Sequence, residues 1–342
     1  MALSSFKIAA FRVEKSHLRR GAMFLVNISV PVIYAATTGH SASALLGGMA
    51  ALVLSFADNE FGLQRRIGLL FAAAACMAAG GAAGFWLSGT PIFLWPGFIA
   101  IAFGVGMAAR LGREPLMATR YGAMAFTAAA GLPAFDLFDA GLLTGVLLLT
   151  AASRAADHAL FGPLPRAAVP PPPQRPSGHI GWIRFALAYA AAGAIALWIG
   201  MTLDPTRAVW VVTTTLIVMQ ADARSSYQRI VERIEGTFIG VIAAWGVASA
   251  ISQRWMLCAM ALVAAPFIPH HVGQRYWLHT ALIALFVLLM YGYASPSIEA
   301  LDALMLERLK DMLLGCVVAI AGTAVAFPRQ REASTGDDDG DT

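Results

Sequence analysis

The chain has 342 residues, of which 58% are hydrophobic and only 13% are Asp, Glu, Lys or Arg. The charged share is about half that of an ordinary soluble domain, and a soluble chain of this length would need more polar surface. The composition therefore excludes a conventional soluble protein, and the small net charge of +4 gives no reason to expect a nucleic-acid partner.

Several long stretches contain no Asp, Glu, Lys or Arg at all. A segment of about 18 or more such residues is a candidate transmembrane helix. The uncharged stretches are 21–57, 67–109, 185–203, 236–253 and 276–298. They predict an all-α integral membrane protein, with the lipid bilayer as its surroundings.

Residues 1–20 form a basic, mildly amphipathic segment without the apolar region of a cleavable signal peptide. We expect a cytoplasmic helix here. Twelve apolar segments follow, and they predict two repeats of about six transmembrane helices each, at 21–160 and 181–328. Three segments, 42–57, 117–132 and 207–221, are too short for a tilted span, which favours partial, re-entrant or shielded helices.

Residues 161–180 separate the two halves. They contain "GPLPRAAVPPPPQRPSG", which cannot form a helix or a central strand and is typical of a semi-stiff polyproline spacer. Residues 329–342 include an acidic segment, "EASTGDDDGDT", that predicts a disordered tail.

The distribution of Lys and Arg predicts the orientation. With both termini in the cytoplasm of a bacterial inner membrane, twenty of the 24 basic residues lie on the cytoplasmic side; the exceptions are Arg207, Arg254, Arg308 and Lys310. This is a strong positive-inside bias.

The two halves also resemble each other. Ala57-Asp58 followed by Arg65 and Gly68 corresponds by eye to Ala221-Asp222 followed by Arg233 and Gly236. Because each half has an even number of segments, both enter the membrane in the same direction. Parallel repeats of this kind are known in transporters, with the pathway at the interface between them.

The second half contains the most specific motif, Arg229-x3-Arg233-x2-Gly236-Thr237-x2-Gly240. Steps of three, four, seven and eight residues place these side chains on one face of a helix. Glu232 can pair with Arg229, and the G-x-x-x-G pair allows a neighbouring helix to approach closely. We expect an arginine-rich collar at the cytoplasmic end of a tightly packed helix.

This motif resembles the transporter domain of the fusaric acid resistance and aromatic acid exporter family, known as FUSC. The family pattern has a Trp before a short apolar segment, then a polar turn, then the arginine and glycine motif. Here these are Trp210 and Asp222, followed by the residues named above, and "ERLKDMLLG" at 307–315 resembles the terminal family element. The resemblance implies an exporter of aromatic or related organic acids, driven by the proton-motive force.

The resemblance has two departures. In the first half, Leu69 and Ala72 replace Thr237 and Gly240, and the proline-rich linker stands where longer members have a large cytoplasmic domain. The family is similar in outline to plant malate-permeable channels, so a passive organic-anion channel is an alternative function. A non-transporting membrane scaffold of an envelope assembly is a second alternative.

An arginine fork can bind both oxygens of a carboxylate. Arg229, Glu232 and Arg233, with Arg65 at the matching place of the first half, are therefore candidate substrate-pathway residues. The alternative is that the collar only anchors the helix to lipid phosphates. Thr214 and Gln220 are further pathway candidates, against simple hydrogen bonding to the preceding helical turn.

Asp311 and Asp222 are candidates for proton coupling, although Asp311 could instead pair with Arg308 or lie solvated at the interface. We find no nucleotide-binding loop, zinc-protease motif or nucleophile elbow, and we predict no enzyme, metal or cofactor. The expected partners are a small organic anion, a second copy in a homodimer, and a periplasmic adaptor protein.

Overall fold

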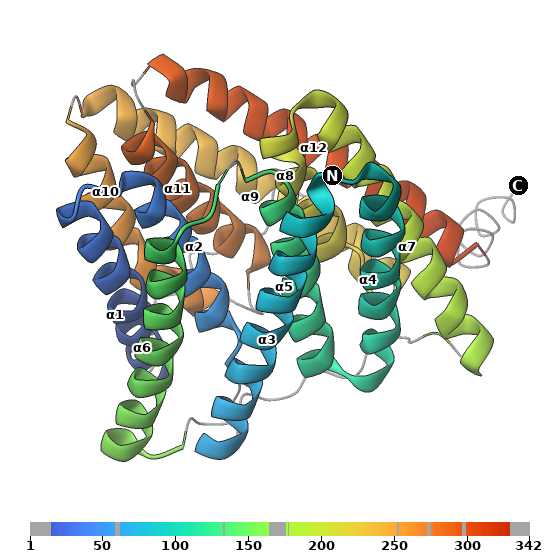
Figure 1. Cartoon of the computed structure of the whole chain (residues 1–342), viewed down its shortest axis with the longest axis horizontal. Helices are drawn as coiled ribbons and strands as arrows, with labels where there is room; N and C mark the ends of the chain where they lie inside the picture. The colour runs from blue at the N-terminus through green and yellow to red at the C-terminus, as the bar shows by residue number, and fades with distance from the viewer. Residues whose placement is uncertain are drawn as a thin grey trace, which may run out of the picture.

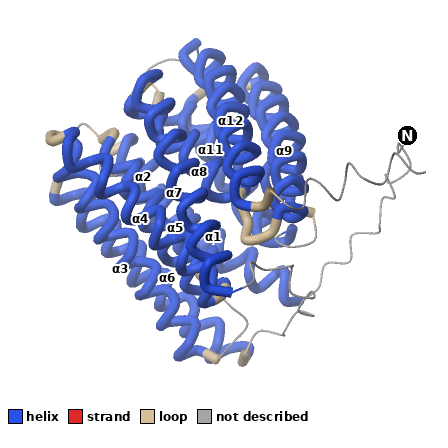
Figure 2. Tube along the Cα trace, turned by 90° about the vertical axis from the view of Figure 1, so that its right-hand side faces the viewer, coloured by secondary structure: helices blue, strands red, loops and turns tan. Residues whose placement is uncertain are grey.

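The computed structural model describes residues 15–58, 62–132, 134–163, 176, 178–251, 253–271, 275–295 and 299–328. Within these ranges the chain forms twelve α-helices and two short 3-10 helices, and no strand (Figure 1 and Figure 2). The predicted all-α class is confirmed. Residues 1–14, most of the proline-rich linker and the acidic tail lie outside the described residues.

Six helices form the first half of the chain. They are α1 (Lys15–Thr37), α2 (Ser41–Phe56), α3 (Leu63–Ser88), α4 (Pro91–Leu111), α5 (Arg113–Ala130) and α6 (Leu137–Phe161). Local sequence sets several ends: Pro91 occupies the first turn of α4, where its missing N–H costs nothing. Asp136 accepts a hydrogen bond from the Asp139 amide and begins α6 with a capping box.

The second half has the same number of α-helices. They are α7 (Gly178–Leu203), α8 (Ala208–Val218) after a 3-10 turn η1 (Pro205–Arg207), α9 (Ala223–Ala250), α10 (Arg254–Ala264) continued by η2 (Ala265–His271), α11 (Tyr276–Ala294) and α12 (Glu299–Ala326). Asp222 caps α9 by accepting from the Ser225 amide.

Seven of the described helices are long and apolar enough to cross a membrane: α1, α3, α4, α6, α7, α11 and most of α12. The chain is a multi-pass membrane protein. Short apolar helices at Ser41–Phe56 and Pro205–Val218 confirm two of the three predicted short segments. The third segment, 117–132, lies mostly within the 18-residue α5, which is not among the seven candidate spans, and Arg254–Pro269 is a further short apolar helix that we had not singled out as short.

Corresponding helices of the two halves pack in the same pairs. α1 packs on α2 as α7 packs on α8, α3 on α5 as α9 on α11, and α6 on α1, α2 and α3 as α12 on α7, α8 and α9. The halves contact each other through α4 against α7 and through η2 against α1. This is the pattern that a six-helix repeat requires, and Figure 1 shows α12 crossing obliquely over the more upright helices of the first half.

Glycine pairs bring the third and fifth helices of each half together. A Cβ added to Gly236 or Gly240 of α9 would collide with the Trp277 or Ala281 carbonyl of α11. On α3 the same contact is made by Gly80 and Gly84 against the Gly122 and Phe126 carbonyls of α5. Gly68, which we matched to Gly236 in the sequence, does not make this contact, because nothing lies within 4 Å of a Cβ added to it.

The short helix α8 is enclosed by its neighbours. Val211, Val212, Thr214, Thr215 and Leu216 have no exposed surface. Gly200 of α7 packs on Ala208, and Gly315 of α12 packs on the Val211 carbonyl. Shielding by protein lets a helix that is too short to span a bilayer lie inside the bundle.

Candidate anion site

Two arginines of the sequence motif lie one turn apart on α9 but have different surroundings. Arg229 places its guanidinium carbon 5.1 Å from the centre of the Tyr276 ring on α11. Arg233 is only 4% exposed, and its Nε has no hydrogen-bond partner among the described residues. Arg229 is therefore half-buried, whereas Arg233, one turn further along α9, lies in the protein core.

The expected collar differs in two ways from the structure. Arg233 is buried against α12 and does not lie on a rim, because α9 continues for ten residues before it. Glu232 accepts a hydrogen bond from Gln228 at 2.7 Å, and within the described part of the chain no ion pair joins Glu232 to Arg229. Gln228 and Glu232 are one turn apart on the same helix, so their hydrogen bond is local, and Glu232 acts on Arg229 through its charge without an ion pair between the two described side chains.

Arg308 of α12 faces Arg233 inside the bundle. It is 5% exposed, and its guanidinium carbon lies 4.1 Å above the Trp210 ring of α8. Its Nε and Nη1 have no hydrogen-bond partner in the described ranges, and the guanidinium experiences the charge of Arg233. The Trp210 face offsets part of the cost of burying this cation, but it leaves the N–H groups unsatisfied.

The neighbouring acids belong to another arginine. Asp311, which is 1% exposed, accepts from Arg207 at 2.7 and 3.2 Å, and Glu307 lies 3.2 Å from the same guanidinium. Asp311 therefore pairs with Arg207 and does not pair with Arg308, which was the alternative considered for it. Arg207, Arg233 and Arg308 lie near Asp311 and Glu307, and Arg207 also experiences the charge of Asp204.

Buried hydroxyl groups accompany these arginines. Thr213 and Thr214 of α8, Thr237 of α9 and Thr280 of α11 each have a buried hydroxyl oxygen with no partner among the described residues. Only Thr215 of this threonine run bonds to backbone, donating to Val211 and Gly315 carbonyls at 3.0 Å. The hydroxyls of Thr214 and Thr237 are therefore available to a ligand.

Gln220 and Asp222 have structural partners. The Gln220 amide donates to the Ile217 carbonyl at 2.6 Å and to the Met219 carbonyl at 3.1 Å, which closes the end of α8. The Asp222 carboxylate accepts from the Ser225 amide at 2.7 Å and caps α9. The structure uses both side chains to satisfy backbone groups at the α8–α9 junction.

Arg65 is separate from this region. It pairs with Glu114 at 3.2 Å, and its side chain is 56% exposed. The buried arginine of α3 is the next residue, Arg66, which has no exposed surface. The first half therefore has a buried arginine on α3, one residue after the position that we expected.

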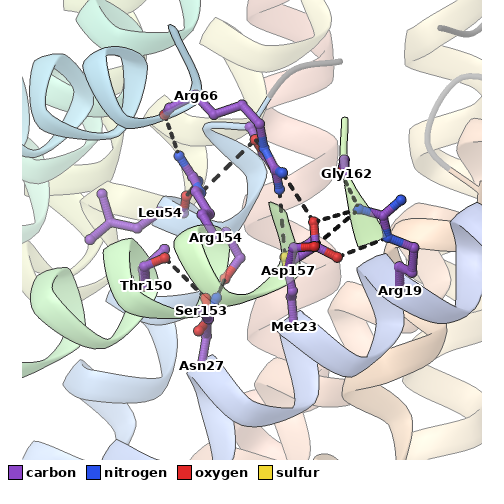
Figure 3. A network of polar contacts seen from close by, with 12 residues as sticks. Arg19, Met23, Asn27, Leu54, Arg66, Thr150, Ser153, Arg154, Asp157 and Gly162 are labelled. Atoms are coloured by element: carbon purple, nitrogen blue, oxygen red, sulfur yellow. Dashed lines mark hydrogen bonds and ion pairs between the residues drawn. The ribbon is translucent and has the colours of Figure 1, made fainter. Parts of the chain in front are cut away.

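Figure 3 shows the network around Arg66. The Arg66 guanidinium donates to both oxygens of Asp58 at 2.8 and 2.9 Å and to Asp157 at 3.0 Å. Arg19 binds the other side of Asp157, and Arg154 donates to the Leu54 and Arg66 carbonyls at 2.7 and 2.8 Å. These contacts join α1, α2, α3 and α6.

The two halves thus treat similar residues differently. Arg154-x2-Asp157 on α6 and Arg308-x2-Asp311 on α12 have the same spacing. The Arg154 N–H groups find protein oxygens, whereas those of Arg308 at Nε and Nη1 do not. The N–H groups of Arg154 are thus bonded within the protein. In the second cluster, Nε and Nη1 of Arg308 are donors that a ligand could use.

A further arginine lies where the halves meet. Arg120 of α5 is 8% exposed and donates to the Tyr189 hydroxyl of α7 at 3.2 Å, which in turn donates to the Leu216 carbonyl of α8. Arg120 and Arg113 act electrostatically on Arg229. We did not predict Arg308, Trp210 or Arg120 as ligand contacts, although an arginine next to an apolar segment was a signal for each cation.

The fold thus defines a multi-pass helical membrane protein, and its interior contains arginine N–H groups without an acceptor among the described residues. Residues 191–322 match the family described as fusaric acid resistance protein-like, which comprises membrane transporters. The resemblance to FUSC proteins is thus confirmed over these residues, which contain α8, α9 and most of α12.

A similar curated protein is the uncharacterized protein slr1298 of Synechocystis sp. (strain ATCC 27184 / PCC 6803 / Kazusa). It is 27% identical over 150 residues, which cover 44% of this chain and 20% of that protein. The match therefore spans about a fifth of the length of that relative. No solved structure matches the chain.

Proposed function

We propose that the protein exports organic acid anions, with aromatic or related monocarboxylates as the substrate class, across the bacterial inner membrane. The observation that carries this proposal is the buried pair Arg233 and Arg308, whose unsatisfied N–H groups lie inside a membrane bundle. A buried charge without a partner costs several kcal/mol, which is on the order of the stability of a whole domain. A transient anionic ligand is a physical reason to keep it.

The arginines give a sequence of contact points for such an anion. Arg229 lies nearest the start of α9 with Arg113 and Arg120 in electrostatic range, Arg233 lies one turn further along, and Arg308 faces Arg233 from α12. With an inside-negative membrane potential, outward movement of one negative charge is favourable by roughly 2.3 kcal/mol per 100 mV. Proton coupling through Asp311 or Asp222 stays a prediction.

Both termini face the cytoplasm in this proposal. The basic residues support that orientation. Exposed tryptophans at helix ends favour the membrane–water interface, but they do so on both sides of the membrane. Trp86, Trp198 and Trp255 are 78%, 59% and 63% exposed, and this topology puts all three at the outer side. Two parallel repeats, a homodimer and a periplasmic adaptor also stay predictions. The glycine pairs of α3 and α9 pack on helices of the same chain, so they do not form the dimer contact.

Flux measurements in proteoliposomes test the proposal. Labelled 4-hydroxybenzoate should leave vesicles that contain the protein faster than protein-free vesicles. Arg233→Gln should slow this flux about tenfold or more, because a charge-assisted contact contributes roughly 1.5–3 kcal/mol. Arg224→Gln is the matched control: it removes an exposed arginine from the same helix and should leave the flux unchanged.

The same vesicles separate the alternatives. At zero membrane potential, an imposed pH gradient drives accumulation by a proton-coupled carrier and has no such effect on a passive channel. A scaffold gives no flux with the wild-type protein. Flux that is equal in the wild type and in Arg233→Gln would refute the role given to the buried arginines.

A further inference from the structure

A cavity of about 110 Å³ lies between the start of α8, the end of α11 and the first turns of α12. Six of its lining residues are chemically informative: Arg207, Trp210, Tyr291, Glu307, Arg308 and Asp311. The cavity is not part of the α9 motif, and neither the family match nor the similar protein assigns a role to it.

The charges around the cavity favour an anion. Arg207 is neutralised by Asp311 at 2.7 Å and by Glu307 at 3.2 Å, so both carboxylates of the lining face another cation. Among the described residues Arg308 makes no ion pair with a carboxylate, although it experiences the charge of Asp311, and the positive charge of Arg233 adds to its own. A bound anion would give the Arg308 Nε and Nη1 groups the acceptors that they lack.

The geometry favours an oxyanion. Arg308 lies with its guanidinium over the Trp210 ring, and the Tyr291 ring lies edge-on to Trp210 at 5.9 Å between centres. The indole ring thus covers one side of the guanidinium, while its Nε and Nη1 groups have no acceptor among the described residues. Hydrogen bonds in the plane of the guanidinium are the way in which arginine binds carboxylates and similar planar oxyanions.

The volume limits the size of the ion. A cavity of roughly 150 Å³ can hold benzene, and one water molecule has a share of about 30 Å³. A cavity of about 110 Å³ therefore has room for an ion as large as acetate or nitrate. A substituted aromatic acid does not fit unless the helices move apart.

We propose that this cavity is a binding site for one small monovalent oxyanion, held by Arg308 beside Trp210 and distinct from the Arg229 end of α9. The bound ion offsets one of the two positive charges of Arg308 and Arg233 and stabilises the packing of α8, α11 and α12. The site binds its ion whether or not the protein transports aromatic acids.

Thermal unfolding of the full chain in detergent tests this site directly. We compare sodium acetate with sodium gluconate at equal ionic strength, because gluconate has the same charge but is too large for the cavity. A ligand that binds only the folded state raises the melting temperature. The wild type should unfold at a higher temperature in acetate, and equal melting temperatures in the two salts overturn the proposal.

Two variants identify the residue that binds. Arg308→Gln should weaken the acetate response about tenfold or more, since it removes a charge-assisted contact. Arg154→Gln is the matched control, because it changes another buried arginine whose N–H groups bind carbonyls. This control should lower the melting temperature in both salts and keep the difference between them. An undiminished acetate response in Arg308→Gln refutes the assignment.

Tryptophan fluorescence provides a second measurement that does not depend on how stable the Arg308 variant is. Acetate should change the emission of the wild type through Trp210, with half-saturation at the concentration that half-saturates the thermal shift. Trp210→Phe keeps an aromatic face for Arg308 and should show no such change. A change that persists in Trp210→Phe places the ion elsewhere and contradicts the proposal.

Discussion

Asp311 pairs with Arg207 at 2.7 Å, and this contact leaves Arg308, one turn earlier on the same helix, without a carboxylate. Asp311 has two arginines as possible partners: Arg308 on its own helix, and Arg207, which is distant in the sequence. Arg207 reaches both oxygens of Asp311 from the 3-10 turn before α8, so the distant partner makes a two-point contact. The consequence is an unpaired cation near the centre of the second half.

Asp311→Asn tests how much the Arg207 contact contributes to the fold. The substitution removes one carboxylate of a largely buried pair and leaves Arg207 with Glu307 as its ion-pair partner and Asp204 as a further acidic neighbour. We expect the free energy of unfolding to fall by about 3–5 kcal/mol, the usual cost of breaking a buried ion pair. Chemical denaturation in detergent measures it. Asp302→Asn, an exposed change on the same helix, should have almost no effect.

Gly236→Ala tests the close approach of α9 and α11. The added methyl group meets the Trp277 carbonyl and Thr280, and overpacking of this kind costs roughly 1–3 kcal/mol. The control is Gly246→Ala on the same helix, where nothing lies within 4 Å of the added Cβ. That change should be neutral or stabilising, because Ala favours a helix by about 1 kcal/mol over Gly. Equal melting temperatures for the two variants would contradict the packing role of Gly236.

Asp157→Asn tests the first-half network of Figure 3. Asp157 binds Arg19 at 2.9 Å and Arg66 at 3.0 Å, and both arginine side chains are at most 13% exposed. Loss of this shared carboxylate should cost about 3–5 kcal/mol of unfolding free energy. Glu114→Gln, which breaks the more exposed pair with Arg65, should cost no more than about 1 kcal/mol. A small effect at Asp157 would mean that α1 and α6 are held mainly by apolar packing.

The helix layout could be predicted because its cause is local. Uncharged stretches show where a chain can cross lipid, and each of the twelve expected segments overlaps one described α-helix. The short segment at 207–221 was recognisable by length alone. Its enclosure by α7 and α12 was not, since that depends on Gly200 and Gly315, which are far apart in the sequence.

The site was harder to predict, because the partner of each charged side chain depends on which distant segments the fold brings together. The spacing of Arg308 and Asp311 favours a pair on one helix, but Arg207, 104 residues before Asp311, takes the carboxylate. Similarly, the spacing of Arg229 and Glu232 allows an ion pair, yet the hydrogen bond that Glu232 accepts comes from Gln228. The sequence match paired Gly236 of α9 with Gly68 of α3. In the structure, the glycines of α3 that pack on a neighbouring helix are Gly80 and Gly84.

The last prediction concerns the stability cost of the open site. Arg308→Met keeps much of the side-chain length and removes the buried charge, while it also loses the contact with the Trp210 face. Desolvation of a buried ion costs several kcal/mol, and a desolvated cation–π contact offsets about 2 kcal/mol of this cost. We therefore expect unfolding in gluconate to require the same free energy as in the wild type, or up to about 2 kcal/mol more.

Arg154→Met is the matched comparison and should have the opposite sign. It removes two charge-assisted hydrogen bonds, to the Leu54 and Arg66 carbonyls, each of which contributes roughly 1.5–3 kcal/mol. Combining Arg308→Met with Arg233→Met should gain less than the sum of the single changes, because either one already relieves the repulsion between the two cations. If Arg308→Met is as destabilising as Arg154→Met, the Arg308 guanidinium is a structural group with partners of its own, and the cavity beside it has no need of an anion.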